Sequence, residues 1–488
     1  MDYINSFPGY EFKKLEDGKM HNIFRGVDVG KGGWVYSDPG IYTNVALLDI
    51  ASMHPTSIIA LNKLGKYTQR YADLRQARVY IKHGDFDSAG KLFDGKLKKY
   101  LVNPDAAGEL SAALKLPLNS FFGVSFATFP NPARDSRDQN NIIALRGALF
   151  MKTLFDEIEN RGFHVIHNKT DSCKVPEATP EIIEFIQGFA RKYGYEMEHE
   201  ATYERICLID DAQYVAAYMS ESECEKRYGY VPSDNKKHFK KNSHPWTVTG
   251  KAFMRPCVFK TLFSGEPIAF EDRCETKTVK DAAIYLDMNE KLPDISSYEK
   301  EIERRINNSD DSKKKMKLNP LYSNMTDEEI NEKICSGHLY EFVGRVGSFY
   351  PIKPGLGGGL LVVKRNNKFD SVSGAKGYRW LESEKVKALG KEADVDLAYH
   401  QKQVDESIEF INKFGDFDQF IDLSRPYSFD KPKAIDISDW EDDDDPPWSE
   451  LPPVVPCGDG KYNTCMECPN CDGDVCRSGY SLAVSNGG

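Results

Sequence analysis

Two aspartates at the ends of predicted strands constrain the fold of this chain more than any other feature. The apolar run Val45–Leu48 predicts a buried strand that ends in Asp49. Two further strands are predicted on either side of a turn at Asn168–Thr170, and Asp171 lies in this hairpin. Carboxylates at the ends of neighbouring strands can meet and hold two Mg²⁺ ions, which activate an attacking hydroxyl and stabilise a leaving phosphate.

The elements around these aspartates indicate the fold class. The hairpin strands are predicted at Phe163–His167 and Ser172–Val175, and helices at Tyr71–Lys82 and Asn140–Asn160. A third helix is capped by Thr179, with a proline at its first position. Because the elements mix without a regular βαβ repeat, we expect an α+β fold with helices on one face of an antiparallel sheet.

Composition places the chain among globular proteins. Its 488 residues correspond to about two to four domains. Apolar residues at 40% and charged residues at 28% exclude collagen, coiled coil and wholesale disorder. The net charge is −11, but residues 431–488 hold 4 basic and 12 acidic residues, which leaves 60 basic and 63 acidic residues before them. A nearly neutral body is compatible with a basic groove for DNA.

No segment predicts membrane insertion or export. Met1–Phe12 lacks the basic start and apolar run of a signal peptide. The longest apolar candidate, Leu356–Val363, is glycine-rich and far shorter than the roughly 18 residues of a membrane helix. We therefore expect a soluble protein of the cytoplasm, with no membrane partner.

A third segment with candidate functional residues is Lys115–Gly123, in which Lys115 and Asn119 stand at positions i and i+4. Such a lysine can neutralise a triphosphate, where catalysis consists mostly of positioning and charge neutralisation. Taken alone, a strand-end aspartate is more often a turn or cap residue, and a helical lysine is more often solvated. The three segments together, in this order and spacing, are a strong signal, whereas each segment alone is a weak one.

The three segments resemble motifs A, B and C of family B DNA polymerases, and they are Asp49–Ile58, Lys115–Gly123 and Asn168–Ser172. Gly32-Gly33 is similar to the family's Y-x-G-G loop, and Asn131–Asp138 and Thr249–Gly265 are similar to polymerases of tailed bacteriophages. The resemblance implies a right-hand polymerase with an antiparallel-sheet palm, helical fingers and thumb, and a C-terminal extension.

The domains implied by the resemblance follow the order of the motifs. They are an N-terminal segment with the first part of the palm at 1–60, fingers at 61–120, palm at 121–262, thumb at 263–340, an accessory region at 341–435, an acidic proline-rich linker at 436–456 and a cysteine-rich module at 457–488.

The resemblance also implies roles for single residues. Asp49 and Asp171 match the two carboxylates that bind Mg²⁺, and the carbonyl of Ile50 matches a backbone ligand. Lys115 matches the catalytic lysine that contacts the triphosphate and can protonate the leaving pyrophosphate.

Nucleotide and DNA contacts follow from the same comparison. Arg78 and Lys82 look like the pair that grips the triphosphate, with Arg75 as the alternative and a merely solvated basic helix as the bland interpretation. The other implied nucleotide contacts are Ser52, His54, Lys115 and Asn119. The implied DNA contacts are Gly32, Gly33, Gly123, Lys169 and Tyr214.

Several positions depart from the family pattern. His54 replaces a tyrosine that blocks a 2′-hydroxyl, so we expect weaker rejection of ribonucleotides. Lys169 replaces an aspartate; it either contacts a primer phosphate or compensates the nearby carboxylates. Pro117 predicts that the helix with Lys115 starts or kinks there. The segment Asp211–Tyr214 stands where the family has a lysine-rich motif.

Only 48 residues precede Asp49, which leaves no space for the family's 3′–5′ exonuclease domain. The expectation is synthesis without intrinsic proofreading. A separate exonuclease or another replisome subunit would then be a partner, with Met1–Tyr42 as a docking segment.

The C-terminal tail carries a dense set of thiols after the acidic run at 436–456, which we expect to be a solvated spacer. The spacing fits tetrahedral Zn²⁺ and also an iron–sulfur cluster, and unmetallated disorder is the third alternative. The five candidate ligands are Cys457, Cys465, Cys468, Cys471 and Cys476.

These patterns predict a DNA-directed DNA polymerase of the bacteriophage type that uses primer-template DNA, dNTPs and two Mg²⁺ ions. Two alternatives remain open at the level of sequence. One is a non-catalytic, polymerase-derived replisome scaffold; the other is a polymerase that tolerates ribonucleotides or RNA templates.

Overall fold

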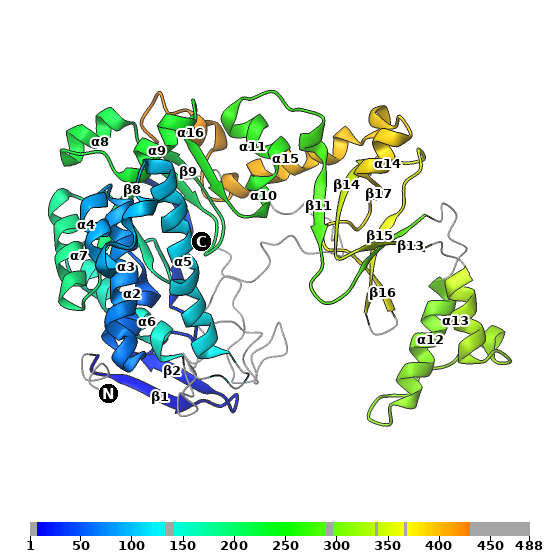
Figure 1. The fold of residues 1–488 in the computed structure, drawn as a ribbon. Helices are drawn as coiled ribbons and strands as arrows, with labels where there is room; N and C mark the ends of the chain where they lie inside the picture. The colour runs from blue at the N-terminus through cyan, green and yellow to red at the C-terminus, as the bar shows by residue number, and fades with distance from the viewer. Residues whose placement is uncertain are drawn as a thin grey trace, which may run out of the picture. The chain divides into compact units, whose positions relative to one another are not determined.

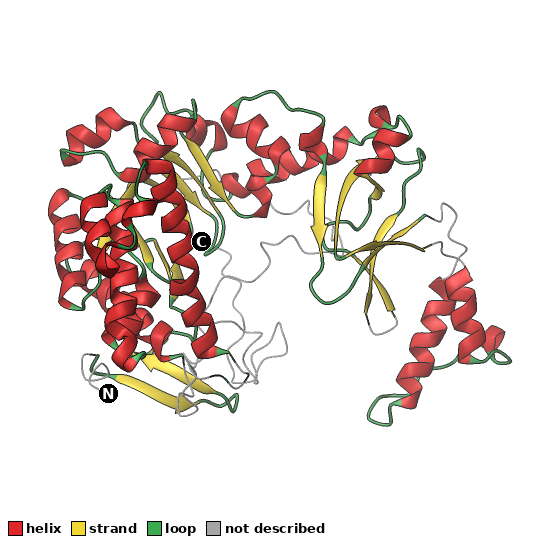
Figure 2. Ribbon diagram, viewed as in Figure 1, coloured by secondary structure: helices red, strands yellow, loops and turns green. Residues whose placement is uncertain are grey.

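The computed structural model describes residues 7–127, 129, 131, 141–288, 296–336, 340–365 and 368–429. It divides into two compact units (Figures 1 and 2), one of Met1–Thr247 with the segment from Phe414 onward, the other of Val248–Lys413. The acidic run at 436–456, the five tail cysteines and most of Asn131–Asp138 lie outside the described residues.

The first unit is built on a seven-stranded sheet with the order β10-β9-β8-β5-β7-β6-β4. Each pair of strands with a defined register is antiparallel, so the prediction of a mixed fold of helices and antiparallel sheet is confirmed. The strands are β4 (Val35–Ser37), β5 (Gly40–Ile50), β6 (His167–Lys169), β7 (Ser172–Pro176), β8 (Met197–Leu208), β9 (Tyr214–Tyr218) and β10 (Trp246–Thr249).

The side chains of strand β5 point alternately to the two faces of this sheet. Leu48 and Ile50 point to one face and join a core that contains residues of helices α6 (Ile142–Glu159) and α7 (Pro180–Lys192). Val45 belongs to a second apolar cluster on the other face. Because side chains alternate along a strand, Asp49 lies on the same face as Val45, away from α6 and α7.

The observed ends of helices α6 and α7 agree with those predicted from the sequence. Helix α6 ends within one residue of the predicted Asn160. The side chain of Thr179 accepts a hydrogen bond from the backbone N–H of Ile182, and Pro180 opens α7, as the capping pattern predicts.

The hairpin that carries Asp171 differs from the prediction. Residues 163–166 form no strand; β6 begins at His167, and the turn consists of Thr170 and Asp171. Val165 and Ile166 are fully buried. The backbone N–H of Ile166 donates to the carbonyl of Lys174 at 3.1 Å, and its carbonyl accepts from the N–H of Asp38 at 2.8 Å. The buried segment before β6 therefore carries the apolar pattern of a strand, although the regular strand begins only at His167.

Helices α2 (Met53–Ala60), α3 (Thr68–Lys82), α4 (Phe86–Lys91) and α5 (Pro104–Phe126) follow β5 in the chain. Helices α3 and α5 pack together (Figure 1), and the hydroxyl of Tyr71 donates to the carbonyl of Leu118 at 2.7 Å. The prediction was that the helix with Lys115 starts or kinks at Pro117, and the structure excludes a start there because Pro117 lies inside α5. Helix α5 starts at Pro104, because Asn103 caps it and a proline is well placed at a first helical position.

Further elements complete the first unit. They are β1 (Tyr10–Lys14), β2 (Met20–Phe24) and β3 (Val27–Asp28), which form a separate sheet, and the helices α8 (Glu221–Tyr228), α9 (Ser233–Lys241) and α16 (Phe417–Ile421). Phe7 and Phe24 from the N-terminal part are buried in the same core as Leu48.

The second unit contains two antiparallel sheets with the orders β11-β14-β17 and β13-β12-β15-β16. Its strands are β11 (Glu275–Thr278), β12 (Ile284–Asp287), β13 (Tyr340–Gly344), β14 (Val346–Ile352), β15 (Leu360–Arg365), β16 (Lys368–Ser371) and β17 (Arg379–Glu382). Its helices are α10 (Lys251–Met254), α11 (Pro256–Phe259), α12 (Ser296–Ser309), α13 (Asp327–Ser336), α14 (Ser383–Ala388) and α15 (Leu397–Asn412).

Short turns of 3₁₀ helix connect these elements in both units, together with one π-helical turn at Lys260–Ser264. The 3₁₀ turns are Gly65–Tyr67, Leu92–Gly95, Lys98–Tyr100, Glu271–Arg273, Pro320–Tyr322 and Glu392–Asp394.

The sheets of the second unit contain residues of both the expected ranges 263–340 and 341–435. Strands β11 and β12 lie in the first range; their partner β14 lies in the second, and their partner β13 begins at Tyr340, the last residue of the first. Strands of four residues carry too few alternations to be recognised from sequence, and their partners are distant in the chain. Among the described residues, no helix combines the length and apolar composition needed to cross a membrane.

A buried arginine attaches the returning C-terminal segment to the first unit. Arg205 of β8 is 2% exposed, and its guanidinium donates to the carbonyl oxygens of Gln419 at 2.6 Å, Phe420 at 3.3 Å and Arg425. Three main-chain acceptors thus depend on one side chain that lies far from them in sequence.

We predict that Arg205→Met lowers the free energy of unfolding by about 2–4 kcal/mol, because buried carbonyl groups lose their donors. Urea denaturation measures the loss. Arg25→Met is the control; Arg25 forms a partly exposed ion pair with Asp156 at 2.6 Å, and its loss should cost about 1 kcal/mol or less. Equal losses in both variants would contradict the assignment.

Candidate active site

The pairing of β5 with β7 brings Asp49 and Asp171 together at adjoining strand ends. Asp49 is opposite Ser172 in the register, and the backbone N–H of Ile50 donates to the carbonyl oxygen of Asp171 at 2.8 Å. Both aspartates are partly buried. The two residues that the sequence singled out from opposite ends of a long segment are therefore neighbours.

Negative charge and burial act on these carboxylates together. Burial, assisted by the charges of Asp171, Glu200 and Glu198, raises the pKa of Asp49 to about 8 against the opposing charge of Lys82. Burial also raises the pKa of Asp171. Two partly buried carboxylates in such surroundings are stabilised by a bound cation.

Glu198 and Glu200 were missed in the sequence. Glu198 of β8 is directly opposite Asp49 on β5. The burial of β8 alternates over Met197–Ala201 and is almost continuous after that. This alternation is the sequence signal that could have located the start of β8 and its glutamates, but only the β5–β8 register places Glu198 opposite Asp49.

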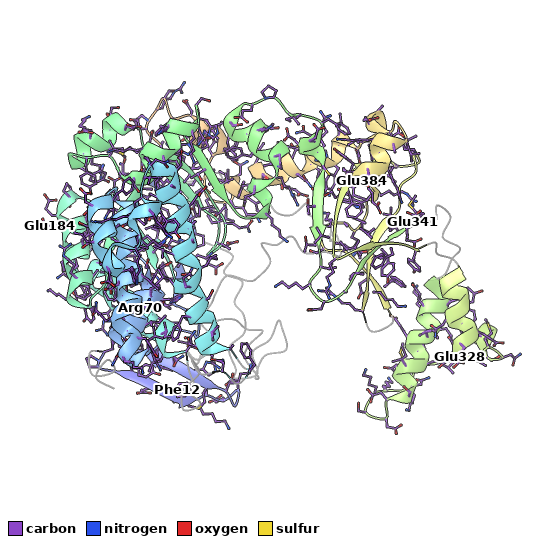
Figure 3. All side chains as sticks on the ribbon, viewed as in Figure 1. Phe12, Arg70, Glu184, Glu328, Glu341 and Glu384 are labelled. Carbon is purple, nitrogen blue, oxygen red and sulfur yellow. The ribbon has the colours of Figure 1, made fainter. Side chains whose placement is uncertain are left out.

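Helix α3 presents basic side chains to this region. Arg78 Nη1 donates to Ser52 Oγ at 3.3 Å, and Lys82 forms an ion pair with Glu198 at 3.3 Å. Arg75, the alternative to this pair, donates from Nη2 to the carbonyl of Ala51, also at 3.3 Å. Arg70 marks the same helix in Figure 3. All three predicted α3 cations therefore contact residues next to, or paired with, Asp49.

Two of these arginines retain unused donors. The Nε atoms of Arg75 and Arg78 are buried and hydrogen-bond to no described residue. A buried donor without an acceptor costs about 1–3 kcal/mol, which an anion bound at this place would recover. Ser52 lies beside them with φ +62°, a conformation that non-glycine residues rarely adopt.

Lys115 and Asn119 lie differently. Both are exposed on α5, and neither contacts Asp49 or Asp171 within the described part of the chain. Gly123 is exposed on the same helix, and a Cβ there would meet nothing within 4 Å. Packing in the described structure therefore does not require glycine at this position.

His54 is fixed by an aromatic neighbour. Its ring stacks on Phe122 of α5 with centroids 4.0 Å apart and planes 9° apart. Burial lowers the pKa of His54, which favours the neutral ring, and its Nδ1 atom is buried without a hydrogen bond to a described residue. The histidine at the departure from motif A is thus a flat, neutral surface.

Of the two predicted glycines, Gly32 and Gly33, only Gly33 lies against the hairpin tip. Gly33 has φ +138°, and a Cβ there would lie 2.9 Å from Thr170 Cγ2. The backbone N–H of Thr170 also donates to the carbonyl of Trp34 at 3.0 Å. A Cβ on Gly32 would meet nothing within 4 Å. Gly33 therefore allows the close approach of a loop to the residue that precedes Asp171.

A buried pair anchors the other side of this hairpin. Lys174 Nζ donates to His167 Nδ1 at 2.8 Å, and His167 Nε2 is 3.1 Å from the carbonyl of Asp211. Burial, assisted by the charge of Lys174, lowers the pKa of His167 to about 4. The neutral imidazole accepts at Nδ1 and donates at Nε2, so it joins the hairpin to the 209–213 loop.

Lys169 and Tyr214, two predicted DNA contacts, lie near the pair of Lys174 and His167. Lys169 Nζ donates to the carbonyl of Asp211 at 2.8 Å, and the ammonium of Lys174 lies 4.6 Å from the ring centre of Tyr214. Lys169 thus contacts main chain rather than either carboxylate. Lys174 and His167 were missed because they fall inside strands of ordinary pattern, and only the sheet brings them together.

The arrangement fits Mg²⁺ in its number of protein ligands. Among the described residues, no group of three or more His, Cys, Asp or Glu side chains could hold a metal ion. Mg²⁺ is commonly bound by one or two carboxylates, with the remaining ligands supplied by substrate phosphates and water. Asp49 and Asp171, with the Ile50 carbonyl beside them, meet that requirement.

Comparisons with known proteins give a distant structural likeness. No family model matches the chain, and no curated protein matches it. Among solved structures, it is similar to the family B DNA polymerase from the hyperthermophilic archaeon Pyrobaculum calidifontis, with a TM-score of 0.36 and 12% sequence identity. The match covers 78% of this chain and 46% of that chain, less than half its length. Function is therefore inferred from the site itself.

We predict that Gly33→Ala displaces the hairpin tip, because the new Cβ meets Thr170 and the backbone conformation disfavours a side chain. The free energy of unfolding should fall by about 1–3 kcal/mol, and Mg²⁺ should raise the melting temperature less than in the wild type. Differential scanning fluorimetry with and without Mg²⁺ measures both. The matched control is Gly32→Ala, which should behave as wild type; identical behaviour of the two variants would refute the packing role of Gly33.

Proposed function

We propose that this protein is a DNA-directed DNA polymerase that extends a primer 3′-hydroxyl with dNTPs in viral DNA replication. The observation that carries the proposal is the position of Asp49 and Asp171 at adjoining strand ends, beside the basic side chains of α3. The motif resemblance supports the same assignment. A non-catalytic scaffold has no need of this costly group of partly buried carboxylates.

Asp49 and Asp171 would hold two Mg²⁺ ions together with the carbonyl of Ile50. When bound, Mg²⁺ supplies charge neutralisation of the phosphates and lowers the pKa of the attacking hydroxyl. The carboxylates would hold the ions beside the primer end, and the cations of α3 would hold the triphosphate, because catalysis of phosphoryl transfer depends mostly on positioning.

The triphosphate would be bound by α3. Arg78 contributes a partly buried guanidinium whose buried Nε lacks an acceptor among the described residues, and Lys82 contributes an ammonium that already neighbours the acidic group. Lys115 and Asn119 are proposed to contact the same polyanion from α5, which packs against α3. Guanidinium groups bind phosphate oxygens with directed hydrogen bonds, so the set favours a nucleotide over a simple anion.

We predict that the purified protein extends a DNA primer on a DNA template with dNTPs and Mg²⁺, and that Asp171→Asn lowers the rate by at least about a thousandfold. Gel-resolved extension measures the rate. The control is Asp311→Asn, which changes a fully exposed carboxylate and should leave the rate unchanged. Extension that persists in Asp171→Asn, or no extension by the wild type on DNA or RNA templates, rules out the proposal.

A ribonucleotide-tolerant polymerase is the second candidate, and the stacking of His54 on Phe122 favours it. A histidine held in this way is smaller than the tyrosine of the motif and leaves space near a sugar 2′-position. We predict a smaller ratio of dNTP to rNTP efficiency for the wild type than for His54→Tyr, by about tenfold. Single-nucleotide incorporation kinetics measure kcat/KM for both substrates, and equal ratios would remove this candidate.

A further inference from the structure

The second unit contains an aromatic cluster on one of its sheets. Tyr285 of β12 has its ring centre 5.6 Å from Phe342 of β13 and 5.6 Å from Phe369 of β16. Tyr340 stacks on Phe369 with centroids 3.9 Å apart and planes 7° apart. Three strands that are distant in sequence therefore contribute to one continuous group of rings.

These rings lie on the face of the sheet that points away from the core. Ile284 and Leu286, which flank Tyr285, are fully buried in the core of this unit. Tyr285 is directly opposite Phe342 in the register, and alternation turns it to the other face. Phe342 is 68% exposed. A phenylalanine so exposed at the edge of an aromatic group indicates a surface that contacts something else.

A cation accompanies the rings. Lys364 of β15 is directly opposite Phe369, and its ammonium lies 5.5 Å from the centre of that ring. The side chain of Lys364 is exposed and forms no ion pair with a described residue. Arg365, the next residue, turns by alternation to the opposite face of the sheet. Glu341, labelled in Figure 3, forms an ion pair with Lys385. The positive charge of Lys364 therefore stands beside the rings.

We propose that this surface binds single-stranded nucleic acid. We name it the aromatic platform, and it consists of Tyr285, Tyr340, Phe342, Phe369 and Lys364. Bases of a single strand stack on aromatic rings while nearby cations contact the phosphates. A duplex hides the faces of its bases inside the helix, so the platform selects unpaired strands. The proposal is independent of the site at Asp49, which belongs to the other unit.

The test uses the full chain and a 5′-fluorescent oligothymidylate, with binding measured by anisotropy in the absence of divalent cations. Phe342→Leu keeps an apolar side chain but removes the ring, and we expect it to weaken binding about tenfold. Phe342→Tyr keeps the ring and should bind as wild type. Leu389→Ala alters an apolar residue that is 62% exposed outside the platform and should have no effect.

Salt dependence tests the cation separately. Lys364→Gln should lower the magnitude of the slope of log affinity against log salt by about 0.7, as expected for one phosphate that the protein no longer neutralises. Equal affinities of Phe342→Leu and wild type, or equal competition by duplex and single-stranded DNA, would overturn the proposal. So would a change in sedimentation of Phe342→Leu without a change in affinity, since the face would then be a protein interface.

The outcome can be separated from that of the proposed polymerase activity. Phe342→Leu should extend a primer on a short template at the wild-type rate, because the platform holds none of the residues assigned to catalysis. Weakened oligonucleotide binding with unchanged extension supports the platform. A chain without any polymerase activity leaves the anisotropy experiment and its interpretation intact.

Discussion

The antiparallel pairing of β5 with β7 is the constraint on which the rest of the site depends. It places Asp49 and Asp171 at adjoining strand ends and joins them through the hydrogen bond from Ile50 N–H to the Asp171 carbonyl. Burial raises the pKa of both carboxylates, and with the charge of Asp171 it brings the pKa of Asp49 to about 8. Such a group lowers the stability of the folded chain, and proteins retain such costs mainly where chemistry requires them.

Two kinds of residue surround this pair of aspartates. Some support the hairpin that carries Asp171, and others supply positive charge. Gly33 packs against the hairpin tip on one side, and Lys174 with His167 joins the hairpin to the 209–213 loop on the other. Helix α3 adds arginine donors that are buried and have no acceptor among the described residues. A rigid acidic centre beside incompletely paired cations suits a ligand that carries both a metal-binding and a polyanionic part, as a nucleoside triphosphate with Mg²⁺ does.

The second unit adds a surface of a different kind. Its aromatic platform uses ring faces and the ammonium of Lys364, whereas the site at Asp49 uses carboxylates and arginines. Stacking tolerates any base, and charge contacts tolerate any sequence, so a platform of this type would hold unpaired strands without reading them. A polymerase chain with such a surface would carry its own means of retaining single-stranded template.

The sequence alone identified Asp49, Asp171 and the capped start of α7, because strand ends, turn residues and caps are local signals. It also predicted most of α3, since helical spacing is local as well, and the motif resemblance pointed to the cations on that helix. Tertiary structure decided which other carboxylates lie near Asp49 and Asp171. Glu198 is opposite Asp49 only because of the register between β5 and β8. It also decided the contact of Lys174 with His167, the start of the hairpin strand at His167, and the sheets built from four-residue strands in the second unit. Register between distant strands is set by the packing of whole faces, and no short window of sequence contains that information.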